Sequence, residues 1–226
     1  MQNVPILTID GPSGSGKGTV SRAAAKSLGW ALLDSGALYR LVALGGRRAS
    51  IDLNDGAGLA RLASKLDICF GSTRSGEEIV TLGGRDVTYD IRTESAGNDA
   101  SKVAALPEVR AALLGRQRRF AVLPGLVADG RDMGTVVFPN ARLKIFLTAS
   151  ADERAARRYK QLKDKGVTAT LAGLSKEIAE RDRRDIMRTA SPLVASEDAV
   201  LLDTTGLSVD AVVERVLRVA CERRLS

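Results

Sequence analysis

A glycine-rich stretch near the N-terminus, from Gly11 to Lys17, carries the pattern G-x-x-x-x-G-K. It follows the apolar run VPILTID and precedes the helix-forming sequence GTVSRAAAKSLG. Glycine permits the left-handed backbone in which successive N–H groups converge on phosphate oxygens, and a helix N-terminus and a lysine ammonium add positive charge. A glycine-rich turn that only caps a helix is the alternative, but the order of strand, loop and helix favours a nucleoside triphosphate site.

The residue after the lysine is Gly18, where this pattern usually has a serine or threonine whose hydroxyl holds Mg²⁺. Without that hydroxyl we expect the metal to be held mainly by substrate phosphates and water. Asp34 and Asp129 end two predicted strands, at the edge of a parallel sheet where ligands bind, and are the carboxylates best placed to orient metal-bound water. A helix cap or a turn is the alternative role for each, and the metal environment stays open.

The composition excludes several classes of protein. The 226 residues are 44% hydrophobic and 27% charged, which is typical of a globular fold, and Cys69 and Cys221 lie too far apart to suggest a thiolate zinc site or a disulfide framework. No secretory leader or membrane span is visible, so we expect a cytoplasmic protein. A net charge of +7 predicts an anionic partner, either nucleic acid or phosphates in a cleft.

Short apolar runs alternate with helical patterns along most of the chain. The runs predicted as strands are residues 4–10, 30–34, 125–130, 143–148 and 199–205. The segments predicted as helices are 18–29, 35–44 with Ser35 as N-cap, 107–123, 151–166, 175–189 and 208–224. This alternation predicts a parallel α/β sheet. Residues 66–92 break the pattern with short alternating runs between glycine and serine turns, and predict a small antiparallel meander inserted into the core.

Four motifs together narrow the class of protein. IDGPSGSGKGT, LLDSGALYR, ADGRDMGTVVFP and ERDRRD, in this order and spacing, resemble the bacterial cytidylate kinases, a family of nucleoside monophosphate kinases. The resemblance covers essentially the whole chain and implies a P-loop NTPase fold, with a parallel sheet core flanked by helices, an inserted monophosphate-binding region with a small antiparallel sheet, and a short lid. It implies one domain, residues 1–226: a core of about 1–40, 105–150 and 190–226, the monophosphate-binding region at about 41–104, and the lid at about 153–170.

The resemblance also implies an activity and a set of site residues. The activity is transfer of the γ-phosphoryl group of ATP to CMP or dCMP, in pyrimidine nucleotide metabolism, with Mg²⁺ as cofactor. The ATP-binding residues would be Gly11, Pro12, Ser13, Gly14, Ser15, Gly16, Lys17, Gly18 and Thr19. The CMP-binding residues would be Ser35, Arg40, Ser101, Arg110, Arg131, Asp132, Arg181, Asp185 and Arg188. Catalysis would rest on Lys17, Arg131, Arg157 and Arg188, and the lid would be the basic stretch near Arg154, Arg157 and Arg158.

These residue types suit that chemistry. Cytosine presents an amino donor and a ring-nitrogen acceptor, so its recognition needs an acceptor such as Asp132 and donors such as Arg110 and Ser101. Arg181 and Asp185 share one face of a predicted helix, which would clamp phosphates, although a solvated face is the alternative. A structural turn is likewise the alternative for GRDMGT, where Arg131 and Asp132 follow a strand.

The acceptor explains how a chain without histidine would catalyse the transfer. A phosphate monoester is largely ionised near neutral pH, so no strong general base is required, and arginines would stabilise the transferring group. We expect no nucleic-acid or membrane partner and a monomer. Two alternatives stay open: a P-loop ATPase that binds nucleic acid through the basic stretches at 115–120 and 153–165, and a kinase for another small acceptor. Aromatic residues, at 4%, are too few for a base-stacking platform.

Overall fold

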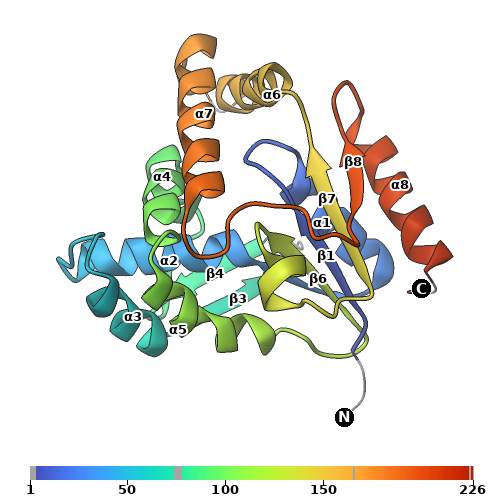
Figure 1. The fold of residues 1–226 in the computed structure, drawn as a ribbon. Coiled ribbons are helices and arrows are strands. Elements are labelled where there is room, and N and C mark those ends of the chain that lie inside the picture. The colour runs from blue at the N-terminus through green and yellow to red at the C-terminus, as the bar shows by residue number, and fades with distance from the viewer. Residues whose placement is uncertain (1–3, 74–77, 165, 224, 226) are drawn as a thin grey trace. The chain divides into compact units, whose positions relative to one another are not determined.

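The computed structural model describes residues 4–73, 78–164, 166–223 and 225. The chain divides into two compact units, one of residues Met1–Asp34 and Arg118–Ser226 and the other of residues Ser35–Gln117 (Figure 1). Each is described below by itself. The functional division into core, monophosphate-binding region and lid stays a prediction.

The first unit contains a five-stranded parallel sheet. Its strands lie in the order β2-β6-β1-β7-β8. Their bounds are β1 (Ile6–Asp10), β2 (Ala31–Asp34), β6 (Leu126–Gly130), β7 (Leu143–Thr148) and β8 (Val200–Asp203). All five predicted strands are present and the predicted parallel sheet is confirmed. In the register, Asp10 is opposite Gly130 and Asp34 is opposite Asp129, so the last residues of β1 and β2 and the penultimate residue of β6 place carboxylates at one edge of the sheet.

Helices α1 (Lys17–Leu28) and α8 (Val209–Glu222) pack together over one face of this sheet. Val20 of α1 and Val216 of α8 share a buried cluster with Leu7 and Ile9 of β1. Alternate strand residues point to the same face, so this cluster is the apolar layer that holds β1 and the start of α1 in place. Helix α1 ends where predicted, at Gly29, which adopts a left-handed conformation with φ 66°.

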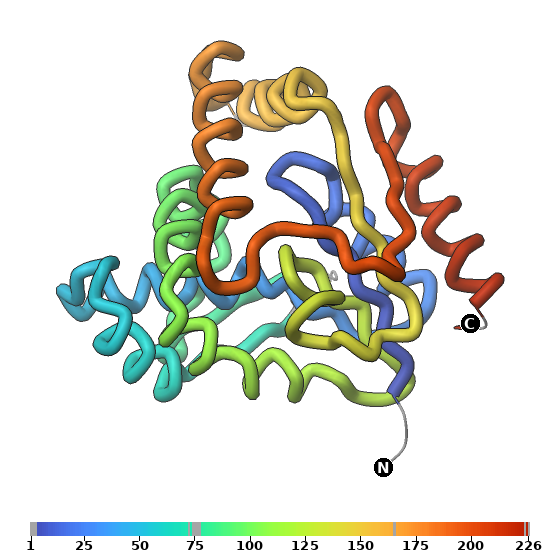
Figure 2. Tube along the Cα trace, viewed as in Figure 1, coloured from blue at the N-terminus to red at the C-terminus, as the bar shows by residue number. Residues whose placement is uncertain are grey.

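The other two helices of the first unit are α6 (Ala151–Asp164) and α7 (Leu171–Met187), which pack against each other. Figure 2 follows the connection from α7 to β8, in which no residue is assigned to a helix or strand. Helix α7 begins four residues before the predicted Ser175, because Thr170 caps it by accepting a hydrogen bond from the N–H of Gly173. Within the described residues, no helix has the length and apolar character needed to cross a membrane.

The second unit combines helices with a small antiparallel sheet. Its helices are α2 (Ser35–Arg48), α3 (Gly56–Lys65), α4 (Glu94–Val103) and most of α5 (Pro107–Arg118), with a short 3₁₀ turn η1 (Asp90–Arg92). Its strands β3 (Ile68–Ser72), β4 (Glu78–Leu82) and β5 (Arg85–Asp86) pair in order and confirm the predicted meander. The part of that prediction at residues 74–77 lies outside the described residues.

Several element predictions for this half of the chain were wrong in detail. Helices α3 and α4 were not predicted, although Asp55 and Thr93 cap them through hydrogen bonds from the N–H groups three residues later. Helix α5 ends at Arg118 rather than at Leu123, because the chain turns there toward β6. Ser35 is the first residue of α2 rather than its N-cap.

Candidate active site

The nine predicted ATP-binding residues form the loop between β1 and α1 and the first turn of α1. Gly14 and Gly16 have φ of 77° and 89°, in the left-handed region that the sequence predicted for the loop. A Cβ on Gly11 would lie 2.2 Å from the carbonyl oxygen of Leu147, so the loop has no space for a side chain there. Helix α1 begins at Lys17, with its first N–H groups at the end of the loop. This is the geometry of a phosphate-binding helix N-terminus.

The side chain of Lys17 folds back onto the loop that precedes α1. Its Nζ donates to the carbonyl oxygen of Pro12 at 3.0 Å. Burial lowers the pKa of Lys17, with a further decrease from the charge of Arg131, while the carboxylates of Asp129 and Asp185 act in the opposite direction. A bound phosphate would replace the neutral carbonyl with charged oxygens and so favour the protonated ammonium.

Asp129 lies beside the position where the usual loop has a hydroxyl. A Cβ built on Gly18 would be 3.2 Å from Oδ2 of Asp129 and 3.7 Å from Nη2 of Arg22. Asp129 is buried, and within the described part of the chain its Oδ1 has no hydrogen-bond partner. Burial raises the pKa of Asp129, as does the charge of Asp34, whereas the Lys17 ammonium lowers it. A buried oxygen with an open lone pair suits a cation or its bound water.

The described residues do not form a complete protein cage for a metal. No three His, Cys, Asp or Glu side chains in the described ranges cluster closely enough to hold an ion. Asp34 and Asp129 nevertheless stand opposite each other at the ends of β2 and β6. One or two carboxylates beside a phosphate loop fit Mg²⁺, which keeps several waters and takes other ligands from substrate phosphates.

The loop after β6 carries Arg131 and Asp132. Nε of Arg131 donates to Oδ2 of Asp185 on α7 at 2.9 Å, and both side chains are largely buried. The pKa of Asp185 lies below its usual value because the charges of Arg131, Arg181 and Arg188 outweigh the opposing effect of burial. Asp185 therefore does not lie on a solvated helix face, and that alternative is wrong for this residue.

Beyond α7, Arg188 is also buried, and its Nε donates to the carbonyl oxygen of Ser191. Asp132 is buried as well, with 2% of its surface exposed. The structure thus gathers the charges of four predicted CMP-binding residues, Arg131, Arg181, Asp185 and Arg188, within the first unit.

Asp10 belongs to this region although the sequence did not single it out. Its Oδ1 accepts from the N–H of Met133 at 2.9 Å and its Oδ2 accepts from the N–H of Gly134 at 2.8 Å. These residues begin a π-helical turn, η2 (Met133–Val137), directly after Asp132. Burial raises the pKa of Asp10 to about 7 in spite of the two N–H donors. The sequence feature that could have indicated a role for Asp10 is its position, at the end of a central strand and directly before the phosphate loop.

Two of the three arginines predicted to form the lid, Arg154 and Arg157, contact the phosphate loop. Nη1 of Arg154 donates to the carbonyl oxygen of Ser13 at 3.1 Å and to Oδ2 of Asp182 at 2.6 Å. Arg154 is buried, with 7% of its surface exposed, so its main contacts are those of a structural support for the loop.

Arg157 has a second set of contacts to the same loop. Its Nη1 donates to the carbonyl oxygen of Ser15 at 3.4 Å and to Oγ1 of Thr204 at 3.0 Å. Thr204, which the sequence analysis missed, also donates to the carbonyl of Ser15. Arg158 instead donates to the side chain of Gln161, one turn further along α6.

The second unit holds the remaining four predicted CMP-binding residues. Nη1 of Arg40 donates to the carbonyl oxygens of Ile91, at 2.6 Å, and Thr93, at 3.1 Å. Ser35, at the start of α2, is 3% exposed, and Ser101, on α4, is 6% exposed. The hydroxyl of Ser101 has no hydrogen-bond partner within the described residues, which leaves it available to a ligand.

The guanidinium of Arg110 contacts both an aromatic ring and a backbone carbonyl group. The guanidinium lies 5.6 Å from the ring centroid of Tyr39 and donates to the carbonyl oxygen of Ala104 at 3.1 Å. Arg110 is buried, so a cation over an aromatic ring is more favourable here than it would be in water. Tyr39 is a neighbour of Arg40 in the DSGALYR motif, but its role was not predicted.

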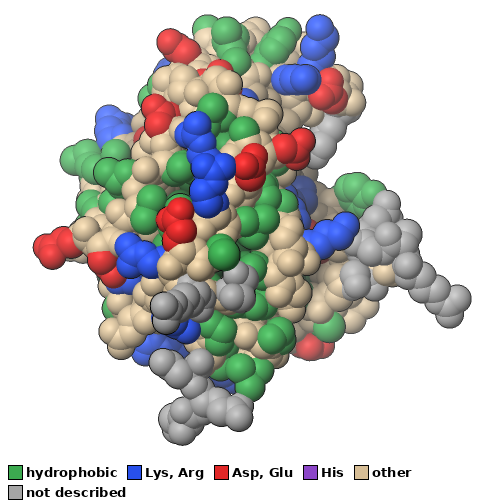
Figure 3. All heavy atoms as spheres, turned by 90° about the vertical axis from the view of Figure 1, so that its right-hand side faces the viewer, with side chains coloured by type: hydrophobic (Ala, Val, Ile, Leu, Met, Phe, Trp, Pro, Cys, Tyr) green, Lys and Arg blue, Asp and Glu red, His purple; other side chains and the backbone are tan. Residues whose placement is uncertain are grey.

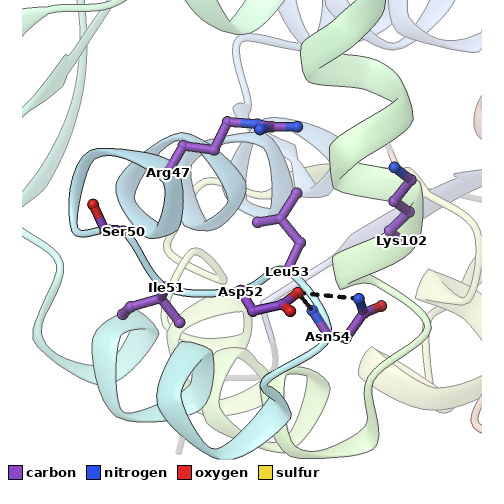
Figure 4. A pocket seen from close by; sticks show the side chains of 7 residues that line it. All are labelled: Arg47, Ser50, Ile51, Asp52, Leu53, Asn54 and Lys102. Atoms are coloured by element: carbon purple, nitrogen blue, oxygen red, sulfur yellow. Dashed lines mark hydrogen bonds between the residues drawn. The ribbon is translucent and has the colours of Figure 1, made fainter.

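A pocket of about 460 Å³ in the second unit contains none of the predicted site residues (Figure 4). Its lining is Arg47, Ser50, Ile51, Asp52, Leu53, Asn54 and Lys102. Asp99 forms ion pairs with both Arg47 and Lys102, and Asp52 accepts hydrogen bonds from Asn54. Its charges are thus balanced by the chain itself, and the pocket is not the candidate active site.

The basic stretch at 115–120 is used partly for internal contacts. Arg116 donates to the carbonyl of Leu66, and Arg118 donates to the carbonyls of Val136 and Val137. On the face shown in Figure 3, basic and acidic side chains are interspersed. On this face the mixed charges do not form a continuous basic track for a nucleic-acid backbone.

Comparison with known proteins identifies the family. The cytidylate kinase family model matches residues 7–222. The chain belongs to the cytidylate kinase family. It is 57% identical over 224 residues to a cytidylate kinase of Stutzerimonas stutzeri (99% of this chain, 98% of the relative) and 58% identical over 214 residues to one of Pseudomonas savastanoi pv. phaseolicola (94% and 93%). Cytidylate kinases are nucleoside monophosphate kinases, so the chain is a phosphotransferase, and the resemblance drawn from the four motifs is confirmed.

Proposed function

We propose that this cytidylate kinase transfers the γ-phosphoryl group of ATP to the 5′-phosphate of CMP or dCMP, through the residues described above, giving ADP and CDP or dCDP. The observation that carries the proposal is the phosphate loop at the head of α1 in a chain matched along residues 7–222 by the cytidylate kinase family. The loop from Gly11 to Thr19 would bind ATP, with its N–H groups and Lys17 directed at the phosphates.

Nine residues are proposed to bind CMP. Within the first unit they are Arg131, Asp132, Arg181, Asp185 and Arg188, and within the second unit they are Ser35, Arg40, Ser101 and Arg110. The buried carboxylate of Asp132 is suited to accept from the cytosine amino group. The hydroxyl of Ser101, which has no partner in the described part of the chain, and the buried guanidinium of Arg110 are suited to donate. Uracil presents a carbonyl oxygen in place of that amino group, so Asp132 would discriminate against UMP.

Catalysis would rest on charge and positioning. Lys17, Arg131, Arg157 and Arg188 would stabilise the equatorial oxygens of the transferring group, and the ionised monophosphate needs no strong base. Arg157 currently donates to Thr204 and to the carbonyl of Ser15, so its contact with phosphate would replace or extend these hydrogen bonds. Closure of the lid and of the monophosphate-binding region would exclude water and prevent hydrolysis of ATP.

Mg²⁺ is the metal we propose. The open Oδ1 of Asp129 and the neighbouring charge of Asp34 would orient its bound waters, since Gly18 offers no hydroxyl. Mg²⁺, when bound, supplies neutralisation of phosphate charge. We further propose that the protein is a cytoplasmic monomer. Its anionic partners would be nucleotides rather than nucleic acid, because several of its arginines make internal contacts.

A substrate panel tests the proposed activity. CMP, dCMP, UMP, AMP and GMP are each supplied with one concentration of ATP, and nucleoside diphosphate formation is measured with and without added DNA or RNA. We expect CMP and dCMP to be the best acceptors without nucleic acid. ATP hydrolysis stimulated by nucleic acid, with no CDP formed, would contradict the proposal.

Asp132→Ala tests the base contact. We expect KM for CMP to rise by about 100-fold, because a buried site built to pair with a polar substrate group discriminates strongly, while KM for ATP stays near its original value. Equal increases for both substrates would count against a role of Asp132 in base recognition.

A further inference from the structure

Asp10 links β1 to the segment that follows β6. It is the last residue of β1 and is 5% exposed. Its two carboxylate oxygens accept from the N–H groups of Met133 and Gly134, which lie 123 and 124 residues further along the chain. We propose that Asp10 is a positioning residue for CMP: it holds the start of η2 and thereby sets the positions of Arg131 and Asp132. The inference rests on the proposed CMP-binding roles of those two residues.

The start of η2 shows why the contact matters. Asp132 is the N-cap residue, the position from which an aspartate usually accepts a hydrogen bond from the helix N-terminus. Here the side chain of Asp132 makes no such capping bond. Asp10 accepts from the first two N–H groups of η2 instead, so the carboxylate of Asp132 is not committed to capping. The acid at the end of β1 thus caps η2 in place of the acid that directly precedes it.

The segment from Gly130 to Gly134 has little room to move independently of this contact. A Cβ on Gly134 would lie 2.9 Å from Oγ1 of Thr8 and 3.1 Å from Cδ of Lys144. The Met133 side chain packs back onto Gly130. A Cβ added at Gly130 would lie 2.7 Å from Cγ of Met133. Close packing transmits a displacement rather than absorbing it, so loss of the Asp10 hydrogen bonds is expected to displace Arg131 and Asp132.

The phosphate loop is less dependent on the Asp10 side chain. The backbone of Asp10 is in register with Gly130 on one side and with Phe146 on the other. The start of the loop is therefore held by two neighbouring strands whatever the side chain at position 10. A positioning role predicts that CMP binding suffers more than ATP binding when this side chain changes.

Asp10→Asn separates positioning from general structural support. Asparagine has one acceptor oxygen, and its NH₂ group would face one of the two N–H donors. We expect KM for CMP to rise by about tenfold, the effect of one charge-assisted hydrogen bond, while KM for ATP changes by less than about twofold. Amide hydrogen exchange in the intact enzyme should be faster at Met133 and Gly134. The control is Asp55→Asn, which alters a carboxylate that accepts from the N–H of Gly58 and should change neither KM.

Two outcomes would overturn the inference: faster exchange at Met133 and Gly134 with unchanged KM for CMP, or equal increases in KM for both substrates. If Asp10→Asn does not fold, Gly134→Ala displaces the same segment from the side of Thr8, and the same outcomes apply. Failure of the proposed function is distinguishable, because Asp132→Ala would then leave KM for CMP unchanged. A normal effect of Asp132→Ala with none from Asp10→Asn would overturn the positioning role alone.

Discussion

The phosphate loop of the first unit and the Ser101 and Arg110 region of the second unit are held in different ways. The loop is shaped by its own glycines and by the strand and helix on either side, and Arg154 and Arg157 of α6 donate hydrogen bonds to its carbonyl groups. Arg110 contacts the aromatic ring of Tyr39 and donates to the carbonyl group of Ala104. The difference teaches that the proposed triphosphate site would rely mainly on backbone geometry, whereas the proposed base contacts would rely on side chains positioned by other groups.

Lys17→Ala should have the largest effect, because it removes the charge on which the loop depends. We expect kcat to fall by about 10³-fold with little change in thermal stability, since the Lys17 side chain makes one hydrogen bond to Pro12. A coupled assay of ADP formation and a thermal melt measure both. Lys26→Ala, at an exposed position of the same helix, is the control. Turnover like that of the wild type would refute the site.

Arg154→Ala tests whether the loop needs support beyond its own backbone. The substitution leaves Asp182 without its buried partner and removes the hydrogen bond to the carbonyl of Ser13. We expect the free energy of unfolding to fall by about 3 kcal/mol and KM for ATP to rise by about tenfold. Urea unfolding and steady-state kinetics are the measurements, with the exposed Lys160→Ala on α6 as the control. An unchanged KM for ATP would mean that the loop keeps its conformation without the Arg154 side chain.

Asp185→Asn tests the side-chain pairing within the first unit as a function of pH. The pKa of Asp185 is lowered from 3.8, so the ionised form stabilises the fold above about pH 4 and this contribution is lost as pH falls through the lower folded-state pKa. We expect the variant to be about 2 kcal/mol less stable at pH 7, with the difference shrinking below pH 4. Urea unfolding across pH 3 to 7 measures it. A difference independent of pH would exclude the ion pair with Arg131 as the cause.

Tyr39→Leu should have the smallest effect and bears on the second unit. Loss of the ring beneath Arg110 removes a cation–π contact worth about 1 kcal/mol, so KM for CMP should rise by several fold while KM for ATP is unchanged. Tyr39→Phe keeps the ring and should retain most of the affinity. If the phenylalanine variant is as impaired as the leucine variant, the ring is not what positions Arg110.

The sequence predicted those parts of the fold whose causes are local. The five strands, the loop and α1 each follow from about ten neighbouring residues, and the glycines of the loop have the left-handed conformations expected of them. Helices α3 and α4 were missed because glycines and polar residues interrupt their apolar pattern. Their capping residues, Asp55 and Thr93, were the signals available.

Contacts between distant parts of the chain could not be predicted in this way. Arg154 was assigned to a lid, which stays a prediction, but its partners, Asp182 and the carbonyl of Ser13, 141 residues earlier, were not foreseen. Asp10 and Thr204 were overlooked for the same reason, since the residues next to each in the sequence do not indicate which distant residue it will contact. Hydrogen bonds of this kind depend on the topology of the sheet, which brings together segments without any shared sequence pattern.

The contact between Gly18 and Asp129 has a consequence for how this loop can change during evolution. A serine or threonine at position 18 would place its Cβ about as close to Oδ2 of Asp129 as the Cβ of Gly18 built here, 3.2 Å, which is tighter than ordinary van der Waals contact. The single substitution that restores the common loop sequence therefore requires Asp129 or the loop to shift by a few tenths of an ångström. A hydroxyl there could then donate to the carboxylate, so the cost of the change is steric rather than polar. Glycine at position 18 lets the acid lie directly against the backbone of α1.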